Sequence, residues 1–335
     1  MRRLNRWRGL AAPVGQVCTF VLLAILIWRL GPSRIADRLA IAGFRLVLAC
    51  FTISFLGFVV LVVKWQVALR TFGAQPRFVR LLGLHLSSTL WGVLLPVPFG
   101  DELYRSGRLA ATGVAAPVFV RAAIVDRCST LFGVTGVGLI AAIVQSDAST
   151  APKAIVVLVC TSCLVSAGFF LVRYPAVWRT LLETGKRLLP PRRLQTMEQW
   201  FTWPRDRHRD LGATLALATA AQVVFACSFL FWTGGFGVHL TIAQSAWALS
   251  ASTLATFAVP LPGMGVAVQQ GALVYVLVQM GATPEQAAAI TVCSLAMLLL
   301  YGGVGMMLEG IGILRTWRAR GVPIVPRHDL SRDPT

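Results

Sequence analysis

The chain has 335 residues, of which 56% are hydrophobic and only 13% are charged, whereas soluble domains carry about 25% charged residues. A soluble globule of this length would need a more polar surface, so the composition excludes an ordinary soluble enzyme. Lysine and arginine outnumber aspartate and glutamate by 31 to 13, which gives a formal net charge of +18. These cations stand where apolar runs end and not along one polar face, a pattern that argues against nucleic acid as a partner and predicts an integral membrane protein.

Several apolar runs are long enough to cross a bilayer, which takes about 20 residues. They are Val14–Leu30, Leu46–Val63, Val118–Val144, Ala154–Val172, Leu211–Trp232 and Gln286–Leu314. The first run follows a cluster of arginines, and no small-residue cleavage site comes after it, so we expect an uncleaved first helix and not a signal peptide. The runs together predict an all-α integral membrane protein with about six transmembrane helices.

Positive charge predicts the orientation of these helices, because loops rich in lysine and arginine stay in the cytoplasm. Arginines crowd the first eight residues, the segment 173–210 and the residues after 314, so both termini and the basic loop 173–210 are expected there. The connections at Gln145–Lys153 and Thr233–Leu240 carry almost no positive charge and are expected outside. The arginines between residues 29 and 45 disagree with this assignment, and we expect a short amphipathic helix there, lying at the membrane interface.

Two shorter apolar segments, Leu81–Leu95 and Ala243–Val259, each stop at a pair of prolines. Proline removes a backbone donor and ends a helix, and two short helices that meet at such a break form a re-entrant hairpin. Irregular backbone is tolerated at membrane depth only where it lines an enclosed or watery cavity. We therefore expect two re-entrant helical hairpins, with two ordinary short spans kinked by proline as the alternative. The expected breaks are at Pro96, Pro98, Gly100, Pro260, Pro262 and Gly263.

An internal repeat links the two proline pairs. A Ser-Thr-Leu sequence precedes both Pro96-Val-Pro98 and Pro260-Leu-Pro262 by five residues, at one constant offset and without a gap. Three full spans separate the two hairpins, and because three is odd, the second hairpin enters from the opposite face. This arrangement predicts inverted repeats, as in many secondary transporters.

The repeat divides one polytopic membrane domain into two halves. Half one covers about residues 46–144 and half two about residues 211–314. The segment 173–210 joins them as a basic cytoplasmic loop, and residues 321–335 are expected to be a disordered tail.

The residues after the first proline pair include a candidate binding site. Asp101 and Arg105 are four residues apart on one helix face, so they can pair. Two interpretations stay open. The carboxylate complements the positive end of a helix dipole, or the helix start supplies free backbone donors and Arg105 a planar guanidinium suited to phosphate.

Asp126 and Arg127 lie inside the run Val118–Val144. Ionisable groups within a membrane helix are functional candidates by default. Adjacent residues on a helix point about 100° apart, so these two cannot simply neutralise each other, and we expect Arg105 and Asp101 as their partners. The alternative is a span that begins later and leaves the pair at the interface.

For most of the other polar residues in apolar surroundings, we expect structural roles. Lys64 closes the second span, and we expect it to snorkel to the interface. We expect His85 to be a core histidine with a hydrogen-bond partner and not a metal ligand, and Glu309 to pair with arginines of the tail. Gln269 and Gln270 follow the second proline pair, where half one has its charges, and their amides can hydrogen-bond a sugar or a phosphate. No catalytic constellation, metal motif or phosphate loop occurs in the sequence, so we expect no enzyme activity and no cofactor.

These motifs resemble those of a known family. At Leu95-Pro-Val-Pro-Phe-Gly-Asp-Glu-Leu-Tyr-Arg105, at Val125-Asp-Arg127 and at Pro260 through Ala272, the chain resembles the lysylphosphatidylglycerol synthase transmembrane-region family, over roughly residues 10–320. Lys64-Trp65 corresponds to the family's Arg-Trp. The family's Gly-Val-Arg-Glu-Gly corresponds to Ala267-Val-Gln-Gln-Gly271, in which amides replace both charges.

The resemblance implies lipid translocation across the bacterial cytoplasmic membrane, by a chain without the family's separate soluble aminoacyltransferase domain. The lipid would be an aminoacylated phospholipid, a polyprenyl-phosphate lipid or a glycolipid. The candidate substrate-binding residues are Asp101, Arg105, Asp126, Arg127, Gln269 and Gln270. Two alternatives stay open: a non-transporting partner of a lipid-modifying enzyme, and a lipid-linked glycosyltransferase, which would need acidic residues on a sizeable external loop. Nothing in the sequence predicts an oligomeric state.

Overall fold

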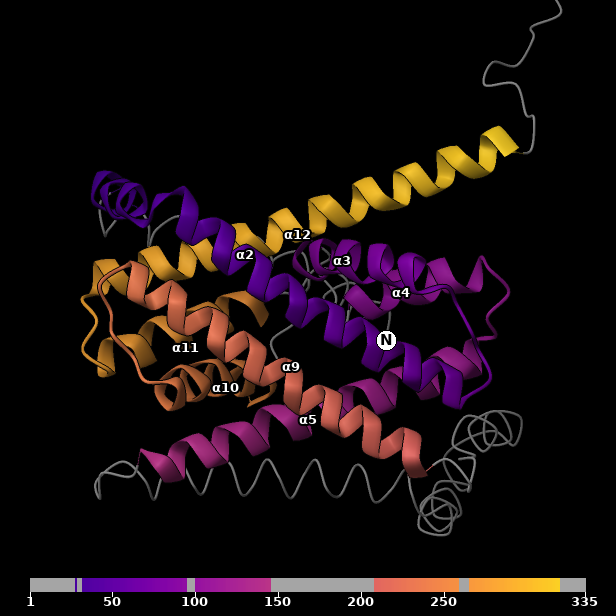
Figure 1. The fold of residues 1–335 in the computed structure, drawn as a ribbon, viewed down its shortest axis with the longest axis horizontal. Helices are drawn as coiled ribbons and strands as arrows, with labels where there is room; N and C mark the ends of the chain where they lie inside the picture. The colour runs from indigo at the N-terminus through magenta and orange to yellow at the C-terminus, as the bar shows by residue number, and fades with distance from the viewer. Residues whose placement is uncertain (1–27, 29–31, 95–99, 146–207, 259–264, 320–335) are drawn as a thin grey trace, which may run out of the picture.

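The computed structural model describes residue 28 and residues 32–94, 100–145, 208–258 and 265–319. Every regular element within these ranges is a helix (Figure 1). The order is α2 (Pro32–Thr71), α3 (Phe78–Leu94), α4 (Gly100–Ala110), α5 (Ala116–Val144), α9 (His208–Gly235), α10 (Ile242–Ala258), α11 (Gly265–Gln279) and α12 (Pro284–Ala319). The expected all-α class is confirmed.

Four stretches of these helices are long and apolar enough to cross a membrane. They are Gly43–Thr71, Ala116–Val144, Arg209–Gly235 and Pro284–Gly312. They correspond to four of the expected spans. The other two expected spans, the loop at 173–207 and the tail at 321–335 lie wholly or almost wholly outside the described residues, so the total number of spans stays a prediction.

Helix α2 is two helices joined at a glycine. Gly43 has φ 65° and ψ 151°, a backbone conformation that interrupts the helix and that glycine adopts without the strain of a side chain. The short helix before it, from Pro32, corresponds to the one expected at the membrane interface, and its place in the membrane stays a prediction. The span after it continues to Thr71, eight residues beyond the predicted end at Val63.

Helices α2 and α9 run side by side in opposite directions (Figure 1). The Ser228 hydroxyl donates to the carbonyl of Cys50 at 3.1 Å, so the first half of α2 meets the second half of α9. At the other end, the hydroxyl of Thr71 donates to a carboxylate oxygen of Asp210 at 3.3 Å, which joins the end of α2 to the start of α9. The pair is therefore antiparallel.

Short helices leave this pair at its two opposite ends through the same turn. After α2, Gly73 has φ 90° and its N–H bonds the carbonyl of Arg70, while the next N–H reaches back to Leu69. After α9, Gly237 has φ 75° and its N–H bonds Gly234, while the next N–H reaches back to Thr233. Both are Schellman endings, in which glycine takes the left-handed conformation. The repeat found in the sequence thus has a counterpart in the backbone.

Each of these turns leads into a pair of short helices in contact with each other, α3 with α4 and α10 with α11. In the first pair, the rings of Trp91 and Tyr104 stack at 5.4 Å between centroids, and His85 lies beside Arg105. Residues later in α3 therefore face residues earlier in α4, which makes the pair antiparallel.

The expected proline breaks follow α3 and α10. These helices are described up to Leu94 and Ala258, and the residues directly after them lie outside the described ranges. Gly100 is the buried first residue of α4. The other expected breaks, Pro96, Pro98, Pro260, Pro262 and Gly263, lie outside the described residues.

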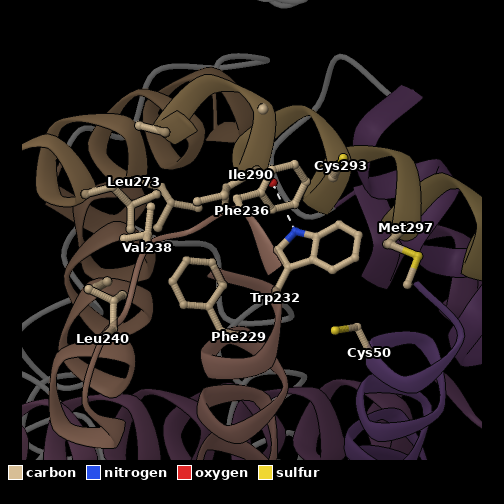
Figure 2. Packing of buried hydrophobic residues seen from close by; sticks show 14 of the residues in the cluster. Cys50, Phe229, Trp232, Phe236, Val238, Leu240, Leu273, Ile290, Cys293 and Met297 are labelled. Atoms are coloured by element: carbon tan, nitrogen blue, oxygen red, sulfur yellow. Dashed lines mark hydrogen bonds between the residues drawn. The ribbon is translucent and has the colours of Figure 1, made fainter. Parts of the chain in front are cut away.

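The described residues form four apolar clusters, of which two are large. The larger one lies where α9, α11 and α12 meet the middle of α2, and in it the Trp232 indole donates to the carbonyl of Ile290 at 3.3 Å (Figure 2). The second cluster joins the last third of α2 to α3, α4 and α5, and includes Trp65, Leu81 and Phe119. The second cluster surrounds the charged residues described below.

Helix α12 packs closely along α3, and a glycine permits the approach. A Cβ added at Gly305 would lie 2.1 Å from the backbone nitrogen of Ser87, so no larger residue fits without moving the helices apart. Small residues at helix contacts are typical of membrane proteins. This contact places Glu309, one turn further along α12, against α3 and α4.

Candidate functional site

Three helices bring six ionisable side chains together in the second apolar cluster. Helix α2 supplies one lysine, α4 supplies two carboxylates and an arginine, and α5 supplies an aspartate and an arginine. The members of this ion-pair network are Lys64, Asp101, Glu102, Arg105, Asp126 and Arg127. With every group ionised, its three positive and three negative charges cancel.

Lys64 and Asp126 form the innermost part of the network. Their charged atoms are 3.0 Å apart, and their side chains are 1% and 9% exposed. The ammonium group also donates to the backbone carbonyl of Asp126 at 3.1 Å and to the hydroxyl of Thr130. The prediction that Lys64 snorkels to the interface is wrong. The physical reason is that α2 continues to Thr71, which leaves Lys64 roughly 10 Å short of the helix end at 1.5 Å per residue.

Arg105 connects the inner and outer parts of the network, and only 3% of its side chain is exposed. Its guanidinium lies 3.1 Å from Asp101 and 3.9 Å from Asp126. The same group lies over the ring of Trp65, 4.7 Å from the centroid, and within 3.3 Å of Nδ1 of His85. The predicted pairing of Asp101 with Arg105 is confirmed, and His85 contacts an arginine in the core.

Arg127 and Asp101 form the accessible edge of the network. One terminal nitrogen of Arg127 donates to both oxygens of Asp101, at 2.8 and 3.0 Å, and the guanidinium also contacts Glu102. The side chains of Arg127 and Asp101 are 34% and 27% exposed, against 12% for Glu102. The expected pairing of Arg127 with Asp101 is thus found, whereas the closest partner of Asp126 is Lys64, and the expected Arg105 lies further away, at 3.9 Å. A molecule that approaches the network through its exposed edge meets the Arg127–Asp101 pair first.

The stability of the fold does not explain such a network. Buried ion pairs are often no more stable than apolar residues of the same volume, while loss of one partner costs about 3–5 kcal/mol because a charge is left buried and uncompensated. Charged residues inside membrane helices are correspondingly functional candidates. A network that contributes little to stability and lies inside membrane helices favours a binding role, although the substrate-binding role of its residues stays a prediction.

A second polar cluster centres on Glu309. Arg108 of α4 donates to one carboxylate oxygen of Glu309 through two nitrogens, at 2.7 and 3.0 Å. The phenol of Tyr104 donates at 3.2 Å, and the hydroxyl of Ser87 also contacts the carboxylate. The expected partners of Glu309 were tail arginines, whereas the structure pairs it with Arg108. The cluster ties α12 to the first pair of short helices.

Gln269 and Gln270 lie on α11, apart from the ion-pair network. Gln270 is buried, with 8% of its surface exposed, and its carbonyl oxygen has no hydrogen-bond partner among the described residues. Gln269 is partly buried. Within the described chain, no hydrogen bond or ion pair joins either amide to the charged residues, so their binding role stays a prediction. Within the same described ranges, no three His, Cys, Asp or Glu side chains are grouped to hold a metal ion.

Fold and site together define a multi-pass helical membrane protein with a buried charged network. The sequence profile of the family described as lysylphosphatidylglycerol synthase TM region matches residues 14–305, so the chain belongs to that family. A comparison with curated proteins finds no match. Membership of this family indicates a membrane protein that handles lipids.

Proposed function

We propose that the protein translocates an amphipathic lipid between the two leaflets of the bacterial cytoplasmic membrane. The lipid carries a phosphate, as in an aminoacylated phospholipid, a polyprenyl-phosphate lipid or a phosphate-linked glycolipid. The observation that carries the proposal is the ion-pair network, a set of charges buried among apolar helices yet accessible at one edge. Family membership supports the same class of function.

The network supplies a charged head group with ionic and hydrogen-bond partners that replace the water molecules it loses. A phosphate that enters hydrocarbon without partners carries a large desolvation penalty. The guanidinium of Arg127 presents the planar fork that binds phosphate oxygens in pairs. The carboxylates of Asp101 and Glu102, which hold Arg127 when no lipid is bound, accept the amine of an aminoacylated head group. A zwitterionic head group carries one positive and one negative charge. It can therefore exchange partners with one ion pair of the network while the net charge of the network and its ligand stays zero.

The helix arrangement supports a path for that head group. The two pairs of short helices begin at opposite ends of the antiparallel α2–α9 pair. We infer that they are re-entrant hairpins entering from opposite faces, related as inverted repeats. A groove between them takes the head group, while the acyl chains stay in the bilayer. Nothing in the described chain supplies an energy source, and transport is passive or ion-coupled.

The depth of the network fits this path. Asp126 lies ten residues into α5, which places it roughly 15 Å from the helix start. The start of α5 and the end of α2 lie beside the start of α9. The basic segment 173–210 leads into α9 in the sequence, and its positive charge assigns this end of the helices to the cytoplasm. The network therefore belongs to the cytoplasmic half of the membrane, where a head group from the inner leaflet reaches it.

Reconstitution in liposomes tests the proposal. Head-group-labelled phosphatidylglycerol, lysyl-phosphatidylglycerol and phosphatidylcholine are offered, and the fraction that reaches the far leaflet is followed by quenching of the outer leaflet. We expect wild type to move at least one phosphate-bearing lipid faster than empty vesicles, and Arg127→Ala to abolish the gain. Arg70→Ala, an exposed arginine at the end of α2, is the matched control and keeps full activity.

The same variants separate translocation from the rival interpretation. A non-transporting partner of a lipid-modifying enzyme depends on the basic loop 173–210 to hold that enzyme. Neutralising the cations of the loop would then abolish function in cells, whereas Arg127→Ala would leave it intact. The translocation proposal expects the reverse. Wild type that moves none of the labelled lipids faster than empty vesicles contradicts it.

A further inference from the structure

A cavity of about 690 Å³ opens where the first pair of short helices begins. It lies between the α2–α3 turn, the α4–α5 turn and the last part of α12, and is thus separate from the side chains of the ion-pair network. Its volume is that of a typical small-molecule site, which ranges over about 300–1,000 Å³.

The cavity carries an excess of positive charge. Arg77, Arg80 and Arg108 line it, and Glu309 is the one acidic side chain among its lining residues. Arg108 is held by Glu309. Arg77 and Arg80 are exposed, and neither has an ion-pair partner among the residues that the structure describes. Two arginines are therefore available to an anion.

The start of α3 adds backbone donors to the same place. The first hydrogen bond of this helix runs from the N–H of Leu81 to the carbonyl of Arg77, so the preceding N–H groups have no partner within the helix. Pro76, Arg77 and Val79, which surround this helix start, line the cavity. Free amides and the helix dipole favour a phosphate there, in addition to the two arginines.

Much of the remaining wall is apolar. Val79, Leu84, Val114 and Leu308 line the cavity beside the arginines. Apolar lining residues do not favour a free inorganic phosphate, because contact with apolar side chains adds no binding free energy for this ion. A lipid phosphate brings glycerol and the first carbons of its chains, which do gain from apolar contact. The lining therefore fits an amphipathic anion.

One face of α4 leads from the cavity to the ion-pair network. Asp101, Arg105 and Arg108 follow one another at spacings of four and three residues, which places them in a row along the helix. Arg108 lines the cavity, and Arg105 and Asp101 belong to the network. A phosphate that leaves Arg108 thus has the ion-pair network about one turn away along the same helix.

We propose that this cavity is the entry site of the protein, which binds the phosphate of a lipid head group before the head group reaches the ion-pair network. The proposal rests on the function proposed above and assigns it a loading step. Arg77 and Arg80 capture the phosphate, and Glu309 is the counter-charge that the phosphate displaces from Arg108.

Binding to the purified full chain in detergent tests the entry site independently of translocation. The probes are dihexanoyl phosphatidylglycerol, dihexanoyl phosphatidylcholine and inorganic phosphate, measured by calorimetry. We expect Arg77→Gln/Arg80→Gln to bind the phosphatidylglycerol about tenfold more weakly, since charge-assisted hydrogen bonds are lost. Glu309→Gln, which frees Arg108, binds it several-fold more tightly. Arg70→Gln binds it as wild type does, and thermal unfolding shows that each variant is folded.

The outcomes are distinct. Equal binding by wild type and Arg77→Gln/Arg80→Gln overturns the entry site, and inorganic phosphate that binds as tightly as the phosphatidylglycerol overturns the lipid assignment. A chain that translocates lipid but shows no binding change in these variants refutes the entry site alone. A chain that binds through Arg77 and Arg80 but moves no lipid refutes the proposed translocation and leaves a lipid-binding site.

Discussion

Arg127 of α5 and Asp101 of α4 lie 26 residues apart in the sequence and 2.8 Å apart in the structure. Asp101 is also held by Arg105, at 3.1 Å. One carboxylate thus joins a partly exposed arginine to a buried one. A phosphate that binds Arg127 competes with this carboxylate for the guanidinium, and the competition reaches Arg105 and, through it, Asp126.

The inner and outer parts of the network are expected to differ in their effect on stability. Asp126→Asn leaves Lys64 charged, buried and uncompensated, so the free energy of unfolding falls by about 3–5 kcal/mol. Asp101→Asn removes a partly exposed carboxylate, so it lowers the free energy of unfolding clearly less than Asp126→Asn does. Urea or thermal unfolding in detergent measures both. Equal losses for the two variants would contradict the division into inner and outer parts.

A compensating double variant separates stability from function. Lys64→Met/Asp126→Leu removes both buried charges, and because apolar residues often replace buried ion pairs without loss, it recovers most of the stability that Asp126→Asn loses. We expect it to remain inactive in lipid transfer, since Arg105 no longer has its carboxylate partner on α5. A stable double variant with wild-type transfer would show that the inner pair has a structural role only.

Close packing of α12 on α3 predicts a contrast between two neighbouring glycines. Gly305→Ala forces a Cβ against the backbone of Ser87, and such overpacking costs typically about 1–3 kcal/mol. Nothing lies within 4 Å of a Cβ at Gly303, so Gly303→Ala is neutral or slightly stabilising through helix propensity. Melting temperatures in detergent measure the difference, and a Gly305→Ala variant as stable as wild type would place α12 further from α3.

The proposed re-entrant hairpins, entering from opposite faces, make a prediction for accessibility. Gln75 lies in the turn before the first pair of short helices and Thr241 in the turn before the second, and both are exposed. In a cysteine-free background, we expect Gln75→Cys to react with a membrane-impermeant maleimide only after the cytoplasmic face is opened, and Thr241→Cys to react in intact cells. Labelling of both from one face would exclude the inverted arrangement.

Much of the helical framework could be predicted from the sequence. Apolar length is a local property, so the four described spans could be predicted from the sequence. The pairing of Arg127 with Asp101 was predictable because Asp126 and Arg127, as neighbours on a helix, cannot neutralise each other. These inferences needed only helix geometry and the scarcity of charges in the chain. The closest partner of Asp126, Lys64, was not predicted.

The misses share a physical cause, which is that helix boundaries and interhelical contacts depend on tertiary packing. The apolar run stops at Val63, which predicts a helix end at Lys64, whereas α2 continues through buried Trp65 and Leu69 to Thr71. Glu102 was passed over, although its position three residues before Arg105 was a usable signal. The pairing of Glu309 with Arg108 joins elements 201 residues apart, and no local pattern predicts it.

The most direct test of the central claim is lipid transfer by the charge-balanced variant Asp101→Asn/Arg127→Gln. This variant removes one cation and one anion, so the network stays neutral and its inner part keeps its partners. We predict that the protein folds with nearly wild-type stability but moves labelled phosphate-bearing lipid across liposomes no faster than empty vesicles, while Arg70→Gln transfers it at the wild-type rate. Undiminished transfer by the double variant would contradict the account, because the head group would then cross without the accessible pair.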